Sequence, residues 1–466
     1  MPPGILSQGE EARRGFLTGI GGLKRGTVEV VTDSIIALGQ PHPAHIISMK
    51  ILVVTHYYPP EIGAPQRRWS ALVKRWQKSG HQVTVFCPPP HYPDAEASRF
   101  LREKHRDTPR IHRGKYGERV LRLPYLLHGP SGVTRLADQI ITATSSVGKA
   151  LILALGGDRF DVVVATVPGL PSAYAGIAIK KLLHVPLVLE LRDAWPDIVA
   201  RPSQEISGIA LRERVKRRFS RSFTRAQRQA DVLVTVTHRF ARKLRGRNMQ
   251  EVVTITNGVT PTMFHSRIDP APQRPGQLRL LYSGTVGRSQ GLITLLQALE
   301  LAQKAQPETR FKLRIVGEGA ERQMLQDYAR ARNLPVKFQP LQPRSQVRKN
   351  YKWCDATIVS LKNTPAFERT VPSKLYELLT VPRFPIALVT GEAADIMQAA
   401  GVGALVEPEN PQELADLWCR LATDRSLLQV GHAGRDFIFK NYNYDQLAQR
   451  YLTVLEKAVE TGRTHS

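Results

Sequence analysis

Three polar side chains that could bind a nucleotide-sugar stand close together at Ser373, Lys374 and Glu377. The ammonium group of a lysine at the start of a helix, with unpaired backbone amides beside it, can bind a phosphate. A glutamate one turn further along the helix can accept hydrogen bonds from sugar hydroxyls. The stretch by itself is equally well explained as a capped surface helix with a solvated lysine and glutamate.

The residues around this triad predict the helix that would position it. Pro372 suits the first turn of a helix, because the N–H group that proline lacks has no partner there. Leu375, Leu378 and Leu379 give the residues that follow one apolar face. We therefore expect a helix that begins near Pro372, with its start directed towards a ligand.

Candidate residues in the first half of the chain also follow apolar runs. Residues 49–54 are predicted to form a strand, and the loop after it reaches Gly63 before a helix begins. Residues 186–191 are predicted to form another strand, and Asp193 follows it directly. Open α/β sheets bind ligands at the carboxyl ends of their strands, so Asp193 is expected to be functional rather than structural.

The second half repeats the succession of strand, glycine turn and helix. Strands are predicted at 278–283 and 311–316, each followed by a glycine-containing turn before a helix. These turns, and the turn after a strand predicted at 252–255, supply further candidates for the same kind of site: Asn257, Gly284, Arg288, Gly317 and Glu318.

The composition limits the classes of partner. Lys and Arg total 66 against 40 Asp and Glu, so the formal net charge is +26 at pH 7 and an anionic partner is expected. No zinc-ligand spacing, helix-turn-helix or basic groove with interleaved aromatics supports nucleic acid. The three cysteines, Cys87, Cys354 and Cys419, are widely spaced, which argues against a disulfide framework or a zinc site and favours a reducing cytoplasm.

One segment concentrates the positive charge. Between Leu211 and Arg228, apolar residues recur every fourth position, and the other faces carry eight Lys or Arg against one Glu. We expect the apolar stripe of this helix to pack on the sheet and its basic face to suit an anionic membrane surface. No apolar run reaches the roughly 18 residues that span a bilayer, and the N-terminus lacks the apolar run of a signal peptide.

The motifs together resemble glycosyltransferase family 4, especially the bacterial capsule, O-antigen and exopolysaccharide branch that includes the L-fucosamine transferases. The resemblance covers about residues 49–458 and depends on the order and spacing of six motifs: YYPPEIG at 57–63, DAWP at 193–196, NGV at 257–259 with Phe264, YSG at 282–284 with Gln290-Gly291, VGEG at 316–319 and VPSKLYE at 371–377. Two Rossmann-like halves, each with glycine turns, point independently to the same fold.

The resemblance implies an α/β protein of GT-B architecture, with two Rossmann-like domains facing a central cleft. It implies a retaining, metal-independent transfer of a sugar from a donor that is usually UDP-linked. N-acetylated amino sugars are among the candidate sugars. The acceptor would be a polyprenyl-diphosphate-linked lipid or a saccharide, and neither a cofactor nor a metal would be needed. The enzyme would act as a peripheral protein at the inner face of the cytoplasmic membrane, without nucleic acid.

The resemblance also suggests roles for the candidate residues. Lys374 and Arg288 would stabilise the departing diphosphate, and Glu377 would hold the nucleotide ribose. Gly63 would let its loop approach the diphosphate, and Asn257, Gly284, Gly317, Glu318 and Ser373 complete the predicted donor site. Asp193 is the candidate for handling the acceptor hydroxyl.

Two positions depart from the usual family pattern. Many members carry two glutamates seven residues apart; Glu377 matches the second, but Arg369 stands where the first is expected, and Glu368 is one residue out of register. Many also carry a lysine where this chain has Gln290. The L-fucosamine-transferase-like branch shares both departures.

The predicted domain plan has five parts. They are an N-terminal extension (1–48), an acceptor-side domain (49–265), a linker (266–277), a donor-side domain (278–442) and a C-terminal helix and tail (443–466) that pack back towards the first domain. Two other functions fit the same residues: a GT-B sugar-nucleotide epimerase, which would need no acceptor, and a non-catalytic scaffold of a polysaccharide assembly complex.

Overall fold

Two parallel sheets, built from separate halves of the chain, account for most of the described residues. The computed structural model describes residues 48–61, 63–91, 103, 109–126, 132–194, 196, 209–260, 268–269, 271, 274–342 and 344–464. The predicted N-terminal extension apart from Ser48, parts of the predicted linker, Trp195 and Phe264 lie outside these residues. The chain from Ser48 onward forms one compact unit.

The first sheet has eight strands in the order β3-β4-β2-β1-β5-β6-β7-β8. All neighbouring strands are parallel except β3 and β4. Since β1 pairs with β2 on one side and β5 on the other, the chain reverses its direction of winding at β1, which is where such sheets bind ligands. The strands are β1 (Lys50–Val54), β2 (Gln82–Cys87), β3 (Ile111–Arg113), β4 (Arg119–Arg122), β5 (Val162–Val167), β6 (Leu187–Leu191), β7 (Val232–Thr235) and β8 (Glu251–Thr254).

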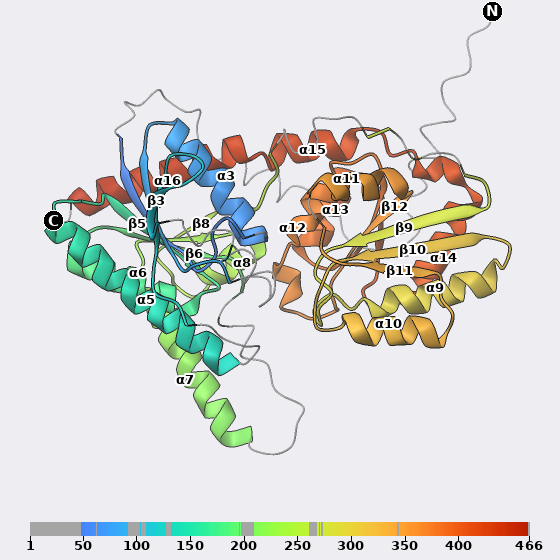
Figure 1. Cartoon of the computed structure of the whole chain (residues 1–466), viewed down its shortest axis with the longest axis horizontal. Coiled ribbons are helices and arrows are strands. Elements are labelled where there is room, and N and C mark those ends of the chain that lie inside the picture. The colour runs from blue at the N-terminus through green and yellow to red at the C-terminus, as the bar shows by residue number, and fades with distance from the viewer. Residues whose placement is uncertain are drawn as a thin grey trace, which may run out of the picture. The chain divides into compact units, whose positions relative to one another are not determined.

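Helices cover both faces of the first sheet (Figure 1). Helix α3 (Ala64–Lys78) shares one buried apolar cluster with α16 (Tyr444–Thr464), the last helix of the chain. The opposite face is covered by α5 (Gly132–Leu155), α6 (Leu170–Leu183), α7 (Ile209–Gln227) and α8 (His238–Arg245). With apolar helices on both faces, the central strands are almost wholly apolar and buried, as parallel strands usually are.

The second sheet has six parallel strands in the order β11-β10-β9-β12-β13-β14. Its reversal point lies between β9 and β12. The strands are β9 (Gln277–Ser283), β10 (Arg310–Val316), β11 (Val336–Gln339), β12 (Ala356–Ser360), β13 (Phe384–Leu388) and β14 (Ala404–Val406).

Two apolar clusters cover the faces of the second sheet. One includes α9 (Ile293–Ala305), α10 (Arg322–Ala331) and α14 (Pro411–Thr423), and the other includes α11 (Arg344–Trp353), α12 (Ser373–Leu378), α13 (Glu392–Ala400) and α15 (Ala433–Asn441). Two short 3-10 turns, Phe367–Arg369 and Arg425–Leu428, complete the described elements. Each sheet with its helices is thus a Rossmann-like α/β layer structure.

The C-terminal helix belongs to the core of the first sheet. The indole Nε1 of Trp76 in α3 donates a hydrogen bond to the carbonyl of Ala448 in α16 at 3.3 Å. The Arg75 guanidinium pairs with the Asp445 carboxylate at 2.6 Å. Residues of α16 therefore help to bury α3, although they follow the whole second sheet in the sequence.

A polar contact joins the loops that follow β7 and β13. The Glu392 carboxylate accepts hydrogen bonds from the backbone amides of His238 and Arg239 at 2.8 and 2.7 Å, and so satisfies the start of α8. The Arg239 guanidinium also binds the Asp395 carboxylate through three contacts of 2.8 to 3.0 Å. These contacts fix α8 of the first sheet against α13 of the second.

Three local predictions need correction. Pro372 is not inside the first turn of its helix; it is the residue before α12, which begins at Ser373 and is only six residues long. The apolar stripe of the basic helix packs only at its C-terminal end, since Phe223 is fully buried whereas Val215 is 59% exposed. The stretch from Pro88 to about Arg119 is rich in proline, histidine and charge, which predicts a long surface excursion, but it contains the edge strand β3 and the first residue of β4.

No helix in the described ranges is long and apolar enough to cross a membrane.

Candidate functional site

The topology of the second sheet brings three candidate loops to one edge. Strands β10, β9 and β12 are adjacent and parallel, so the loops that follow them leave the sheet side by side. Gly317 follows β10, Arg288 lies in the loop after β9, and Lys374 lies beyond β12. The strand order therefore places these three loops at one edge of the sheet, the kind of edge at which open α/β sheets bind ligands.

The two glycine turns of this edge are in backbone contact. Gly317 has a φ of +146°, and a Cβ atom there would collide with the carbonyl oxygen of Gly284. The Val286 amide donates to the Glu318 carbonyl at 2.8 Å, which joins the second turn to the first. Glycine is required at position 317 for both its conformation and this close approach. The Glu318 side chain lies outside the contact and pairs with Arg322 at 3.5 Å.

Gln290, which departs from the family pattern, holds its own turn together. Its side-chain Oε1 accepts a hydrogen bond from the Gly287 amide at 3.1 Å, and its carbonyl accepts one from the Ser360 hydroxyl at 2.6 Å. Arg288 in the same turn is exposed and has no hydrogen bond or ion pair within the described part of the chain. Arg288 is therefore the side chain in this turn whose cation is available to a ligand.

Glu377 is the most strongly held polar side chain of the site. It is only 5% exposed, and its Oε1 atom lies 3.1 Å from the Lys374 ammonium and accepts the Tyr351 hydroxyl at 2.8 Å. Burial alone would raise the pKa of Glu377, but the charges of Lys374 and Arg67 and the hydrogen bonds of Tyr351 and Lys374 lower the pKa to about 2. The carboxylate is thus ionised at neutral pH, and its charge fixes the position of Lys374.

A residue of the first sheet also reaches Glu377. The Arg67 guanidinium, on α3, lies 3.4 Å from Oε2 of Glu377. Gly63 is the residue immediately before α3, and its extended backbone is one that any residue can adopt. The start of α3 and the start of α12 are therefore in contact through Arg67 and Glu377, which brings two separately predicted donor-site elements together.

The 3-10 turn before α12 is anchored on both sides. The carbonyl of Arg369 accepts a hydrogen bond from the Thr237 hydroxyl, at the end of β7, at 3.0 Å. Gly391 has a φ of +66°, and a Cβ atom there would collide with the backbone of Glu368. The stretch with Glu368 and Arg369 is therefore fixed by its backbone, whichever side chain stands at position 369.

Asp193 and Asn257 lie at the carboxyl edge of the first sheet, as predicted. Asp193 follows β6, and burial raises its pKa, a shift that the neighbouring charge of Arg192 opposes. Asn257 is 7% exposed in the loop after β8. The next residue, Gly258, lies against the carbonyl of Tyr442, where a Cβ atom would collide. The structure gives no contact between either residue and the Lys374–Glu377 pair.

Sequence reasoning missed Arg67, Tyr351 and the neighbours of Asp193. The Arg68 guanidinium binds both oxygens of Glu190 at 2.9 to 3.2 Å, and all of these side chains are fully buried. Two adjacent arginines at the start of a helix that follows a glycine loop were the available signal for Arg67 and Arg68. Nothing local to the sequence marks Tyr351, because it binds Glu377 from a separate helix, α11.

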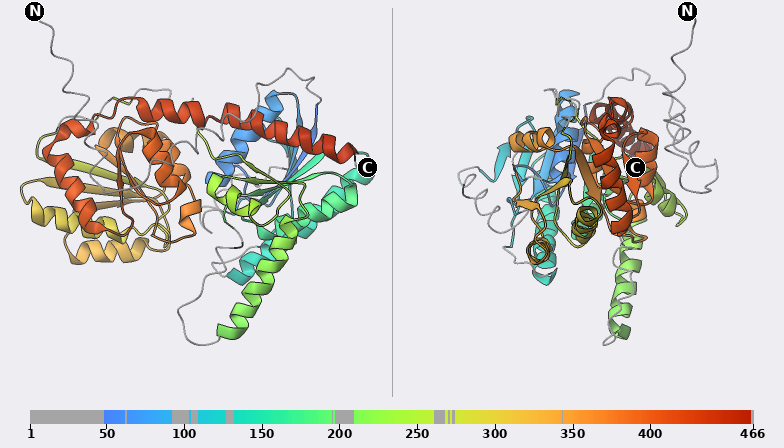
Figure 2. Two further views of the ribbon diagram at one scale, coloured as in Figure 1. Left: turned by 180° about the vertical axis from the view of Figure 1, so that it is seen from behind. Right: turned by 90° about the vertical axis from the view of Figure 1, so that its right-hand side faces the viewer.

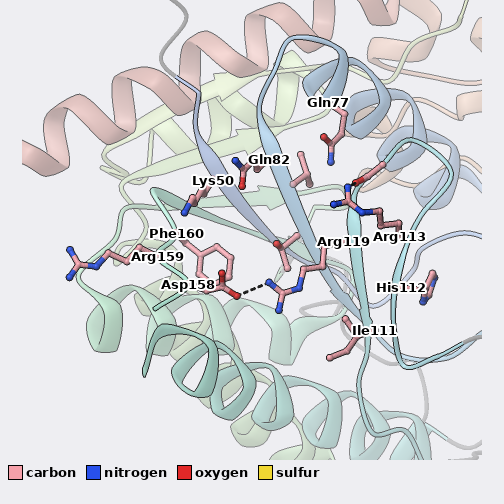
Figure 3. Close-up of a pocket in the computed structure, with 13 residues that line it drawn as sticks. Lys50, Gln77, Gln82, Ile111, His112, Arg113, Arg119, Asp158, Arg159 and Phe160 are labelled. Carbon is pink, nitrogen blue, oxygen red and sulfur yellow. Dashed lines mark hydrogen bonds and ion pairs between the residues drawn. The ribbon is translucent and has the colours of Figure 1, made fainter. Parts of the chain in front are cut away.

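A large groove lies at the opposite edge of the first sheet (Figure 3). It has a volume of about 710 Å³ and is lined by the first residues of β1 and β2, Lys50 and Gln82, and by residues that precede β5. The Arg119–Asp158 ion pair, at 2.6 Å, lies within it. Because the amino ends of parallel strands point away from the carboxyl-edge loops, this groove is separate from the candidate site.

Two family models match the chain in succession. Residues 63–258 match the model described as "Glycosyl transferase 4-like domain", and residues 267–436 match the model described as "Glycosyl transferases group 1". The matches meet between the two sheets, so each model corresponds to one Rossmann-like layer structure.

Relatives and solved structures agree with these matches. The chain is 27% identical over 394 residues to WcaI of Escherichia coli (strain K12), named as a glycosyl transferase of colanic acid biosynthesis, with 78% of this chain and 90% of WcaI covered. Sucrose-phosphate synthase from Thermosynechococcus elongatus superposes with a TM-score of 0.66 at 15% identity, over 89% of this chain and 100% of the synthase. HepE of Anabaena, in complex with UDP and glucose, gives a TM-score of 0.61 at 15% identity, over 88% and 100% of the chains.

Proposed function

Because the chain belongs to the glycosyltransferases of family 4 and is a transferase with the GT-B fold, we propose that it transfers a sugar from a UDP-linked donor to a lipid-linked or saccharide acceptor in cell-surface polysaccharide synthesis. The observation that carries the proposal is the Lys374–Glu377 pair at the carboxyl edge of the second sheet, which Arg67 contacts from the first. The name of WcaI and the UDP bound to HepE support the polysaccharide and the donor, respectively.

The donor half of the proposed reaction uses fixed positive charge. Lys374 and Arg288 stabilise the departing diphosphate, and no bound metal ion is required for that role. Among the described residues, the Oε2 atom of Glu377 has only the long hydrogen bond with Arg67, and this oxygen accepts the ribose hydroxyls of the nucleotide. Further donors to the phosphates are backbone amides that neighbour Gly284 and Gly317 in their turns and the amide of Ser373.

The acceptor half uses the first sheet. The acceptor hydroxyl attacks the anomeric carbon on the face from which the diphosphate departs, so the configuration at that carbon is retained. The bond between that carbon and the diphosphate oxygen breaks as the new glycosidic bond forms, and the hydroxyl proton moves to Asp193. A carboxylate whose pKa is raised is a better proton acceptor than an exposed one, which fits Asp193 for the role.

Donor binding is the direct test of this function. Among UDP-, GDP- and dTDP-sugars, we expect only UDP-sugars to raise the Tm, since a ligand present at 100 times its Kd stabilises the folded state by about 2.7 kcal/mol. Glu377→Gln should lose most of the shift, because the amide binds ribose hydroxyls less well and leaves Lys374 without its partner. Glu308→Gln, at an exposed position before β10, is the matched control.

The donor screen separates three outcomes. A GDP- or dTDP-sugar that stabilises the protein in place of UDP-sugars would overturn the UDP assignment. An equal UDP shift in wild type and Glu377→Gln would overturn the role of Glu377. Free epimerised nucleotide-sugar, formed without transfer to an acceptor, would identify an epimerase instead.

We also propose that the protein acts at the inner face of the cytoplasmic membrane and docks there through α7 and α5. The first half of α7 extends away from the sheet (Figure 2) and exposes Val215 together with basic side chains. Helix α5, which covers the same face of the sheet as α7, also exposes large apolar side chains, with Ile152 61% and Leu155 81% exposed. Apolar side chains flanked by cations are what an anionic bilayer surface binds.

We expect the protein to sediment with anionic vesicles and not with neutral ones, and to be released by high salt. Changing Arg217, Arg218 and Arg221 to glutamine should weaken this binding about 100-fold, since each basic residue contributes on the order of 1 kcal/mol. All three side chains are exposed on α7. Glutamine at Lys312, Lys337 and Lys349, exposed on the second sheet and its helices, is the control of equal charge.

Three results would contradict this docking surface. They are equal binding to neutral vesicles, binding that does not respond to salt, and equal losses in the two triple variants.

A further inference from the structure

Arg192 is a half-buried cation, and part of its guanidinium is buried without a hydrogen-bond partner. It follows β6, and its backbone amide donates to the carbonyl of Val167, so it lies at the carboxyl edge of the first sheet. The Nε and Nη1 atoms of its guanidinium are buried and have no hydrogen-bond partner in the described part of the chain. A guanidinium has five N–H groups and is never neutralised by loss of a proton, so these two nitrogen atoms belong to a group that stays charged.

The surrounding carboxylates do not compensate Arg192. Glu190 is two residues earlier, but both of its oxygens are bound by the fully buried Arg68. Arg68 also donates hydrogen bonds to the carbonyls of Ile255 and Thr256, so the protein itself supplies the partners of its charge. Asp193, the other acidic neighbour, makes no ion pair with Arg192 within 4.0 Å among the described residues.

Buried N–H groups of a charged side chain are costly to leave without a partner, and a ligand with acceptor oxygens would satisfy them. The free N–H groups of Arg192 lie on more than one edge of the guanidinium, which suits a group with several oxygens. Phosphate has this form, and arginine binds it through parallel hydrogen bonds. The cations that we assign to the donor, Lys374 and Arg288, both belong to the second sheet, whereas Arg192 adjoins Asp193 in the first.

We propose that Arg192 forms a second anion site, which binds a phosphate group of the acceptor and thereby positions the acceptor hydroxyl beside Asp193. This inference rests on the proposed function, since it assumes that the first sheet holds the acceptor. It adds a specificity: the enzyme selects acceptors that carry phosphate close to the reacting hydroxyl.

The first test uses the protein without ligand. If the protein itself used the charge of Arg192, Arg192→Met would lower the Tm. A charge that only a ligand pairs with does not stabilise the ligand-free protein. The Tm of Arg192→Met is therefore expected to equal or exceed that of wild type. Arg192→Lys keeps a positive charge but loses the planar guanidinium, and its Tm should not exceed that of wild type. A Tm of Arg192→Met several degrees below wild type would overturn the proposal.

The second test adds inorganic phosphate to protein saturated with UDP, at constant ionic strength. Phosphate should raise the Tm of wild type further, because UDP occupies only the donor site. Arg192→Met should lose this increment, with at least a tenfold weaker phosphate response, and should keep the full UDP shift. Arg420→Met, at an exposed position on α14, is the control and should retain both shifts.

The remaining outcomes are separable. An undiminished phosphate increment in Arg192→Met would show an adventitious ion only. If phosphate raises the Tm of wild type without UDP but not when UDP is saturating, Arg192 binds the diphosphate of the donor. That result would overturn the acceptor assignment. Absence of any UDP shift would contradict the proposed donor instead, while the phosphate titration of the UDP-free protein would still report on Arg192.

Discussion

Replacing Lys374 by alanine is expected to lower kcat/KM by about 100-fold or more, because it removes a fixed positive charge from the departing diphosphate. Both donor affinity and turnover should fall, since the ammonium contacts phosphate before and during bond cleavage. The protein should remain folded, because Glu377 keeps Tyr351 and Arg67 as partners. Steady-state kinetics and UDP binding by calorimetry measure the two effects.

A conservative and a distant variant sharpen this prediction. Lys374→Arg keeps the charge and should recover part of the activity. Lys312→Ala removes an exposed lysine from β10 of the same sheet and should behave as wild type. Wild-type rate and donor affinity in Lys374→Ala would remove this residue from the donor site.

Replacing Asp193 by asparagine should lower kcat by about 100-fold or more while the Kd for the donor changes by less than about threefold. The residue lies on the first sheet, so its loss should affect the acceptor proton and not the nucleotide. Burial raises the pKa of the Asp193 carboxyl, so the rate of wild type should fall as the pH is lowered through that raised value. This fall in rate at low pH should be absent from the pH profile of Asp193→Asn.

Kinetics at several pH values, with UDP binding measured in parallel, check this assignment. Asp436→Asn, an exposed carboxylate on α15, is the matched control. An unchanged kcat would exclude Asp193 from the chemistry. Normal turnover with weakened UDP binding would move it to the donor side.

The central strands could be predicted from the sequence because burial on both faces makes them apolar throughout. Strands such as β1 and β5 appear as short runs of valine, leucine and isoleucine, bounded by polar or glycine-rich loops. The loops that hold Gly63, Asp193 and Gly317 could therefore be placed at strand ends before the fold was known. The order of the strands then places these loops at the carboxyl edges of the two sheets.

What could not be predicted depends on long-range contacts. Helix α5 was not predicted, since it exposes Ile152 and Leu155 on the face that would ordinarily be polar, which blurs its periodicity. The Arg67–Glu377 contact joins residues 310 positions apart, and no local pattern encodes it. The unused donors of Arg192 are likewise a property of its neighbours, because they depend on Arg68 having engaged Glu190.

The docking of α16 onto α3 also governs the order in which the protein can be completed as it is synthesised. The strands of the first sheet leave the ribosome early, yet Trp76 on the apolar surface of α3 packs against Ala448 and Tyr451, which are made after the second sheet. While the second sheet is being translated, that surface must remain open or be covered by other means. The first domain is therefore a discontinuous folding unit, which is completed by a helix that is made after the whole second sheet.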